Sequence, residues 1–92
     1  MVNVRKHIYV HGRVQGVGFR AFIKRNAKKN NVHGWAKNLT DGRVEAILTG
    51  KKINVERLIK KIKKGPRMAR VNKVDIFDET YRGEFTSFSI KY

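Results

Sequence analysis

The spacing of apolar residues changes repeatedly along the chain, and this alternation limits the possible folds more than any other feature. In "RKHIYVHGRV", residues 5–14, Ile8 and Val10 alternate with polar or aromatic side chains, the period-two pattern of a half-buried strand. In "FRAFIKRNAKKNN", residues 19–31, apolar residues recur every three to four positions, as on one face of an amphipathic helix. The sequence therefore predicts a strand followed by a helix that stops near Asn30 and Asn31.

The same two patterns recur in the rest of the chain. Two further strands are joined by a short turn, in which we expect Asp41 to serve the turn itself. After a second helix, two more apolar segments predict a fourth strand and a short fifth one. We expect these strands at residues 32–39, 43–50, 69–77 and 85–92.

The segment "NVERLIKKIKK", residues 54–64, predicts the second helix. Its apolar stripe has the spacing i, i+3, i+4 and i+7 and consists of Val55, Leu58, Ile59 and Ile62. We expect Asn54 to be the N-cap and Ile53 to pack on Leu58 as a hydrophobic staple. The dipeptide Gly65–Pro66 is expected to end the helix.

The resulting order, β-α-β-β-α-β, consists of two split βαβ units. Both apolar helix stripes are expected to cover one face of a mostly antiparallel sheet of four to five strands. This is an α+β, ferredoxin-like sandwich. No linker, repeat or low-complexity tract interrupts the chain, so we expect a single domain over residues 1–92.

The composition excludes several classes of protein. The chain has 92 residues and no cysteine, which excludes disulfides, thiolate–metal sites and a phosphocysteine intermediate. His7, His11 and His33 are scattered and lack carboxylate-rich neighbours, so we expect strand or surface positions and no metal or other cofactor. No apolar run approaches the ~20 residues that span a bilayer. The N-terminus lacks the pattern of a signal peptide, and we expect a cytoplasmic protein.

The formal net charge is +15, from 22 Lys and Arg against seven Asp and Glu. Such a charge attracts phosphates and is compatible with a nucleic-acid-binding module. It is equally compatible with a solvated, highly charged surface such as many heat-adapted proteins have. The basic residues are spread along the chain and are not interleaved with aromatic residues. We therefore favour the solvated surface, with weak nucleic-acid affinity as a side effect and attraction of a small anionic substrate as a third contribution.

The stretch "GRVQGVGFR", residues 12–20, joins the first strand to the first helix. It is neither a P-loop, which needs Gly-Lys-Ser/Thr, nor a dinucleotide fingerprint, because Ala21 occupies the place of the third glycine. Successive backbone N–H groups at a helix N-terminus can converge on a phosphate-sized anion. Arg20 adds a planar guanidinium that matches two phosphoryl oxygens. The alternative is a plain strand-to-helix turn in which the glycines only relieve steric crowding.

This stretch resembles the first signature of the acylphosphatase family at every residue. The stretch "GWAKNLTDGRVEAILTG", residues 34–50, resembles the second signature, G-[aromatic]-[small]-[basic]-N-x3-G-x-V-x5-G. The matching positions are Gly34, Trp35, Ala36, Lys37, Asn38, Gly42, Val44 and Gly50. The likeness extends over essentially the whole chain, which resembles the small single-domain members of archaea and thermophiles.

The resemblance implies hydrolysis of the carboxyl–phosphate bond of an acyl phosphate to a carboxylate and inorganic phosphate. It implies that Arg20 binds the phosphoryl group and that Asn38 orients the attacking water. The amides of Gln15, Gly16, Val17, Gly18, Phe19 and Arg20 would form the phosphate cradle. The resemblance implies no metal, a small-molecule substrate, phosphate as product and competitive inhibitor, a monomer, and no specific nucleic-acid or membrane partner.

Two alternatives remain open at this point. One is a basic nucleic-acid-binding module on a ferredoxin-like sheet, which the charge favours and the aromatic pattern does not, because we expect Trp35 and Phe22 to pack in the core. The other is an acylphosphatase-like domain that handles carbamoyl phosphate within a larger hydrogenase-maturation protein. That protein would be expected to continue into cysteine-rich zinc motifs.

Overall fold

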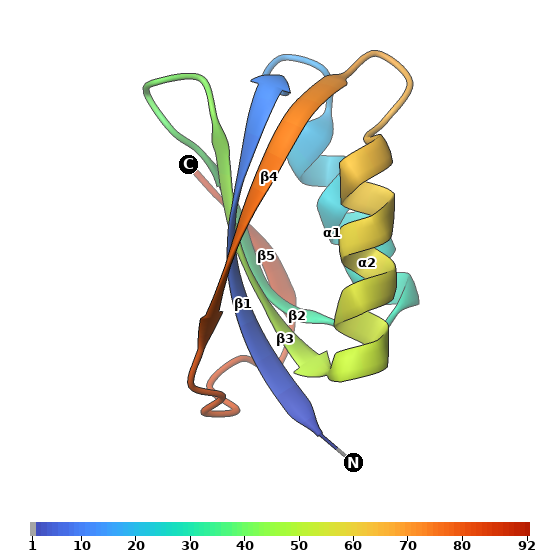
Figure 1. Ribbon diagram of the computed structural model, residues 1–92, viewed down its shortest axis with the longest axis vertical. Coiled ribbons are helices and arrows are strands. Elements are labelled where there is room, and N and C mark those ends of the chain that lie inside the picture. The colour runs from blue at the N-terminus through green and yellow to red at the C-terminus, as the bar shows by residue number, and fades with distance from the viewer. Residues whose placement is uncertain (1) are drawn as a thin grey trace.

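The computed structural model describes residues 2–92 and has two layers, a five-stranded sheet and a pair of helices (Figure 1). The first strand and helix are separated only by the glycine-containing loop, as the apolar spacing predicts. The elements in chain order are β1 (Asn3–Arg13), α1 (Phe19–Lys29), β2 (His33–Asn38), β3 (Val44–Lys51), α2 (Lys52–Lys64), β4 (Arg70–Glu79) and β5 (Phe88–Lys91).

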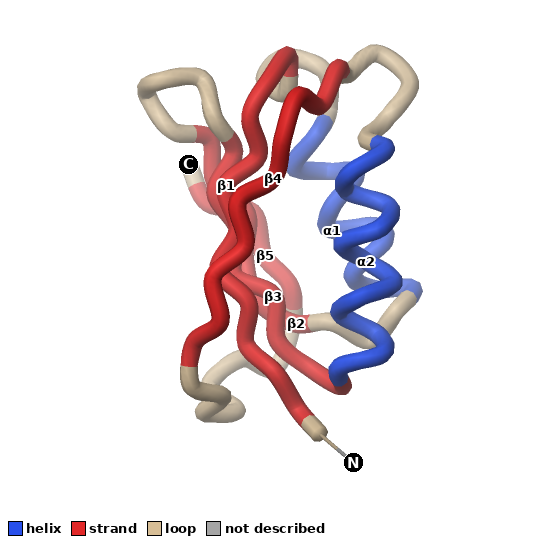
Figure 2. Tube along the Cα trace, viewed as in Figure 1, coloured by secondary structure: helices blue, strands red, loops and turns tan. Residues whose placement is uncertain are grey.

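The sheet has the strand order β4-β1-β3-β2-β5. Every pairing is antiparallel except that of β2 with β5, which is parallel. Both helices lie on the same side of the sheet and leave its other face open (Figure 2). The sequence prediction of a mostly antiparallel ferredoxin-like sandwich is confirmed, with the fifth strand present at the sheet edge.

The core lies between the sheet and the helices because each strand and helix presents one apolar face to it. In β1, Ile8 and Val10 are fully buried, while Tyr9 between them faces the open side of the sheet. The predicted stripe of α2 is buried, and α1 buries Phe19, Ile23, Asn26 and Ala27. Val44, Ala46 and Leu48 complete this core from β3 at 0% exposure.

The start of α2 differs from the sequence prediction. The helix begins at Lys52, directly after the last residue of β3, so Asn54 lies inside its first turn and is not the N-cap. The Lys52 amide donates to the Val2 carbonyl oxygen at 3.0 Å. A backbone carbonyl next to β1 therefore accepts from the helix N-terminus in place of a capping side chain. The staple expected between Ile53 and Leu58 is also wrong, since Ile53 lies inside the helix and not before its N-cap, and it is 54% exposed.

Trp35 does not pack in the core, contrary to the expectation from the sequence. In β2 the buried positions are Gly34 and Ala36, and the period of two places Trp35 on the open face of the sheet. There the Lys91 ammonium lies 4.5 Å from the centre of its ring. Phe22 is half-buried on α1, edge-on to Phe19. Among residues 2–92, no helix is long and apolar enough to cross a membrane.

Candidate active site

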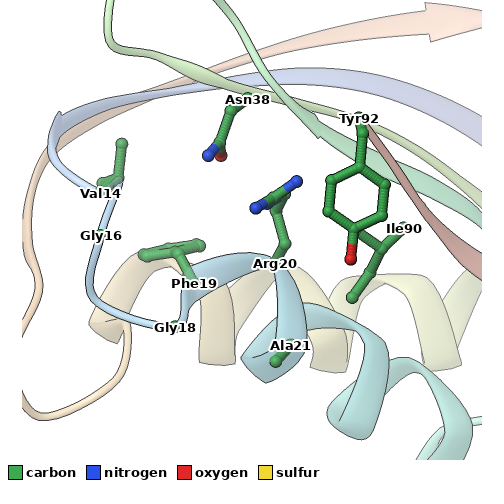
Figure 3. A pocket seen from close by; sticks show the side chains of 9 residues that line it. All are labelled: Val14, Gly16, Gly18, Phe19, Arg20, Ala21, Asn38, Ile90 and Tyr92. Carbon is green, nitrogen blue, oxygen red and sulfur yellow. The ribbon is translucent and has the colours of Figure 1, made fainter.

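A pocket of about 210 Å³ opens where the β1–α1 loop, the end of β2 and β5 meet (Figure 3). It forms because β2 lies between β3 and β5 in the sheet and ends beside the N-terminus of α1. Segments far apart in the sequence thus meet at one end of the sandwich. The lining residues are Val14, Gly16, Gly18, Phe19, Arg20, Ala21, Asn38, Ile90 and Tyr92.

The β1–α1 loop takes its shape from two glycines in the left-handed region. Gly16 has φ 71° and Gly18, the N-cap of α1, has φ 74°. A Cβ at either position would meet nothing within 4 Å, so the backbone conformation and not crowding calls for glycine. No backbone amide from Gln15 to Arg20 donates a hydrogen bond to an acceptor within residues 2–92. The loop therefore leaves a run of free N–H donors at the positive end of a helix.

Arg20 lies in the first turn of α1 and is half-buried. Its Nη1 donates to the Lys91 carbonyl oxygen at 3.1 Å, and its guanidinium carbon lies 4.8 Å from the centre of the Tyr92 ring. The Arg20 side chain forms no ion pair with any carboxylate of residues 2–92. These contacts orient the guanidinium without neutralising it, which leaves a full positive charge in the pocket.

Asn38 is the last residue of β2 and enters the pocket from the sheet side. Its carboxamide and the Arg20 guanidinium point into the same space, one from the sheet and one from the helix (Figure 3). The period of two along β2 puts Asn38 on the same face as the buried Ala36, facing the helices. A neutral hydrogen-bonding group thus faces a cation across a space open to a small ligand.

The side chain of Gln15 connects the loop to the hairpin between β2 and β3. Its Nε2 donates to the carbonyl oxygens of Leu39 at 2.7 Å and of Arg43 at 2.9 Å. The Leu39 amide in turn donates to the Arg43 carbonyl oxygen at 2.8 Å. Because Leu39 follows Asn38 directly, this one carboxamide ties the loop to the strand end that carries Asn38.

The structure brings most of the predicted site residues together. Gly16, Gly18, Phe19, Arg20 and Asn38 line one pocket, whereas Gln15 and Val17 do not line it.

Four lining residues were not predicted from the sequence. They are Ile90 and Tyr92, which form the wall at the end of β5, together with Val14 and Ala21. A fifth strand was predicted at 85–92, but nothing in its sequence indicates that it pairs in parallel with β2. In that pairing Ile90 stands opposite Ala36 and Lys91 opposite Lys37. The wall next to Asn38 therefore depends on a strand pairing that the sequence pattern leaves open.

The histidines lie outside this pocket, on strands of the sheet, as the sequence predicts. Two of them have carboxylate neighbours, contrary to the expectation from the sequence, because strand pairing brings these residues together. On the open face, His7 lies between Glu45, with Nε2 2.6 Å from Oε2, and Glu79, with Nδ1 2.9 Å from Oε2. His11 Nε2 lies 2.8 Å from the Asp75 carboxylate. In the described part of the chain, no group of three or more His, Cys, Asp or Glu side chains could hold a metal ion. Of the residues that line the pocket, only Arg20 and Tyr92 have titratable side chains.

Comparison with known proteins agrees with this arrangement. A family model described as Acylphosphatase matches residues 6–90. An acylphosphatase of Syntrophus aciditrophicus (strain SB) is 47% identical over 88 residues, which cover 96% of this chain and 92% of that protein. The crystal structure of acylphosphatase from Bacillus subtilis superposes with a TM-score of 0.93 at 35% identity, covering 97% of this chain and 99% of that one.

The fold also occurs inside a much longer protein. The crystal structure of T. kodakarensis HypF is similar with a TM-score of 0.85 and 33% identity, over 97% of this chain but only 12% of that one. The curated relative is instead covered nearly from end to end. Together with the loop, the unpaired arginine and the facing asparagine, these matches show that the chain belongs to the acylphosphatase family.

Proposed function

We propose that this enzyme binds the phosphoryl group of an acyl phosphate with Arg20 and the free amides of residues 15–20, and that Asn38 orients the attacking water. The observation that carries the proposal is that Arg20 and Asn38 project into one pocket above a loop whose amides lack acceptors. A phosphoryl dianion satisfies the loop donors and offsets the unpaired guanidinium at the helix N-terminus. The ligand thus compensates for the loop amides that lack acceptors and for the Arg20 cation at the positive end of the helix.

The chemistry requires little beyond binding and orientation. Water forms a new O–P bond, the bond between phosphorus and the acyl oxygen breaks, and the carboxylate leaves with the bonding electron pair. Negative charge on the equatorial phosphoryl oxygens is stabilised by Arg20 and the loop amides, which are already oriented before the reaction. No metal takes part in this scheme.

Asn38 acts as a positioning group for the water and not as a base. Its carboxamide oxygen accepts a hydrogen bond from the water, but an amide is too weakly basic to remove the proton. The proton passes instead to a phosphoryl oxygen of the substrate as the O–P bond forms. A carboxylate is a good leaving group, so no general acid is needed.

The direct test is the release of phosphate from acetyl phosphate and benzoyl phosphate, with and without EDTA. We expect turnover that EDTA does not reduce, with inorganic phosphate as a competitive inhibitor. Absence of turnover by the unaltered protein would refute the proposal. Turnover that EDTA abolishes would refute its metal-independent scheme.

The rate should be nearly independent of pH through the neutral range. Asparagine and backbone amides do not titrate, and arginine stays protonated. We therefore expect a flat enzyme profile once ionisation of the substrate is taken into account. A steep limb near pH 6–7, where histidine ordinarily titrates, would implicate His7, His11 or His33 in catalysis.

We further propose that residues 1–92 act as one domain, as a cytoplasmic monomer that recognises no specific nucleic-acid sequence. Both edges of the sheet discourage pairing with another chain: β4 has the charged residues Lys73, Asp75 and Asp78, and β5 has only four residues. Light scattering should give the mass of one chain. A stable dimer at micromolar concentration would contradict this part of the proposal.

A further inference from the structure

The two helices carry half of the positive charge of the molecule and almost none of its negative charge. α1 and α2 contain eleven of the 22 Lys and Arg but only one of the seven acidic residues, Glu56. No Lys or Arg of either helix forms an ion pair within residues 2–92. The six other acidic residues all form ion pairs on the sheet or its connecting segments, and they are Asp41, Glu45, Asp75, Asp78, Glu79 and Glu84.

This distribution differs from a surface of interspersed charges that stabilise one another. On such a surface the carboxylates would be shared between the two faces, as in the ion-pair networks of heat-adapted proteins. Here the carboxylates pair with cations on the sheet side, for example Glu79 with Arg5 and Asp78 with Lys6. The positive charge of the helix layer is left without compensation.

The unpaired cations come together in a groove of about 410 Å³ between the C-cap of α1 and the side of α2. Its lining consists of Asn30, Arg57, Lys60, Lys61 and Lys64. The four cations have the spacing i, i+3, i+4 and i+7, which places them on one face of α2, where like charges repel one another. The two helices lie side by side over the sheet (Figure 1).

We propose that this groove, the α2 basic groove, binds the phosphate backbone of double-stranded nucleic acid without reading its sequence. The four cations extend over about 10 Å of helix axis. The same length of duplex carries about six phosphates. Each cation can therefore meet a phosphate, and the lining has only one amide, that of Asn30, for other contacts.

The groove offers nothing for stacking bases of a single strand. Tyr9, Trp35 and Phe77 lie on the open face of the sheet, on the other side of the molecule from the helices. Binding of single strands usually relies on such aromatic platforms. The groove thus fits the higher charge density of a duplex.

An anionic membrane surface fits the same groove less well. Surface-bound amphipathic helices insert an apolar face below the lipid headgroups. The apolar stripe of α2 is already used against the sheet, and it consists of Val55, Leu58, Ile59 and Ile62. The groove also shares no lining residue with the catalytic pocket, so binding there leaves the phosphatase site accessible.

The test compares two variants with the same net charge by anisotropy of a labelled, random-sequence DNA duplex. The groove variant replaces Arg57, Lys60, Lys61 and Lys64 with Gln. The matched control replaces four exposed cations elsewhere, Lys51, Lys52, Lys73 and Arg82, with Gln. Circular dichroism and the turnover of acetyl phosphate establish that each variant is folded, and both should retain the wild-type rate.

We expect the affinity of the unaltered protein for the duplex to fall as the salt concentration rises. A plot of log association constant against log salt concentration should have a slope of about −3.6, because each of four phosphate contacts contributes about −0.9. The groove variant should lose most of that slope and bind at least about tenfold more weakly at 50 mM salt. The control should stay close to the unaltered protein.

Three outcomes would overturn the proposal. An equal loss in both variants would show that the total charge matters and the groove does not. A wild-type slope shallower than about −1 would exclude a multi-phosphate contact. Tight binding to phosphatidylserine vesicles without binding to the duplex would assign the groove to a membrane surface.

The double contact of Gln15 supports a second inference, which rests on the proposed function. We infer that the Gln15 side chain is a positioning residue that holds Asn38 at its distance from the phosphate loop. Its carboxamide donates to Leu39 and Arg43, the two ends of the hairpin that follows Asn38. Gln15 is not among the residues that line the pocket, so its side chain, unlike its backbone amide, acts through Asn38 and not on the substrate.

Gln15→Glu keeps the size of the side chain but replaces the donating amide with a carboxylate, which faces two carbonyl oxygens. We expect kcat to fall about tenfold, because two hydrogen bonds become repulsive. The inhibition constant of inorganic phosphate should change little, because Arg20 and the loop amides remain. In an Asn38→Ala background, the same change should have no further effect on kcat.

The pair of variants separates failure of this inference from failure of the proposed function. If Asn38→Ala retains full activity, the proposed role of Asn38 is wrong. If Asn38→Ala loses activity while Gln15→Glu has no effect, or has the same effect in both backgrounds, the positioning role of Gln15 is wrong.

Discussion

Two arginines of this protein lie over tyrosine rings at the same distance but in opposite electrostatic surroundings. The guanidinium of Arg20 is 4.8 Å from the centre of the Tyr92 ring, and that of Arg43 is 4.8 Å from the centre of the Tyr9 ring. Arg43 is also paired with Asp41, with Nη2 2.8 Å and Nε 2.9 Å from Oδ2. Within residues 2–92, the only hydrogen-bond acceptor of the Arg20 side chain is the Lys91 carbonyl oxygen.

The difference separates a charge that holds a turn from a charge that is available to a ligand. Asp41 closes the β2–β3 turn by accepting from the Arg43 backbone amide and side chain, so the charge of Arg43 is satisfied within the fold. The charge of Arg20 is not, and it lies at the helix end where a cation is disfavoured. The same residue type and the same aromatic contact therefore hold a turn in one place and, in the proposed function, bind the substrate in the other.

The largest expected effect is that of Arg20→Ala. We expect kcat/KM for acetyl phosphate to fall about 10³-fold or more, because a guanidinium that stabilises a transferring phosphoryl group contributes on this scale. Tm should stay equal or rise slightly, since a cation at the positive end of α1 is removed. Arg20→Lys should restore part of the loss, because it keeps the charge without the planar fork. A fully active Arg20→Ala variant would show that Arg20 does not bind the substrate and that it does not differ from Arg43 in this respect.

The next effect is that of Asn38→Ala, which leaves both arginines in place. We expect kcat to fall about 10²-fold, the scale of losing one positioned hydrogen-bonding group. KM should change little, since in the proposed function Arg20 and the loop amides hold the phosphoryl group. Steady-state kinetics with acetyl phosphate measure both constants. A large rise in KM with unchanged kcat would assign Asn38 to substrate binding instead of water positioning.

A smaller effect is expected from Arg43→Ala, the matched control for Arg20→Ala. Activity should stay close to that of the unaltered protein, because Arg43 does not line the pocket. Alanine retains the backbone carbonyl that Gln15 contacts. Thermal unfolding should show a modest fall in Tm from the loss of the Asp41 pair. If Arg43→Ala were as inactive as Arg20→Ala, the separation between structural and binding arginines would not hold.

The smallest effect concerns the pH dependence of Asp41. Hydrogen bonds from the Arg43 side chain and backbone amide hold the pKa of Asp41 below its ordinary value. The contribution of Asp41 to stability is therefore present above the ordinary aspartate pKa of about 3.9 and is lost as pH falls through the lower folded-state value. Asp41→Asn should lower Tm slightly at pH 7 and leave it unchanged at the acid end of the profile. A difference in Tm that grows towards acid pH would contradict this sign.

Most of the fold could be predicted from the sequence because apolar spacing reports directly which face of an element is buried. The stripe of α2 and the alternation in β3 were both sufficient for this purpose. The first residue of α2 could not be predicted, because the Lys52 amide donates to the Val2 carbonyl oxygen, which is far away in the sequence. Trp35 was misplaced because aromatic size favours burial, while the small Gly34 and Ala36 already occupied the inward positions of its strand.

The site divides in the same way. The loop and Arg20 could be predicted from local chemistry, since glycines before a helix create an anion site within a few residues. Asn38 was placed only through the resemblance to the family signature, because no local pattern brings it next to the loop. Ile90 and Tyr92 depend on the parallel pairing of β5 with β2, and the Gln15 contacts depend on a hairpin more than twenty residues away.

The direct passage from β3 into α2 determines where this chain can be lengthened. One residue inserted between Lys51 and Lys52 would rotate the α2 stripe by about 100° relative to the sheet and displace the amide that meets Val2. Residues 80–87, between β4 and β5, are mostly exposed, form no helix or strand, and lie at the opposite end of the molecule from the β1–α1 loop (Figure 1). An epitope tag or a fluorophore therefore belongs between Thr80 and Gly83, ahead of the Glu84 ion pair with Arg5 and far from the candidate active site.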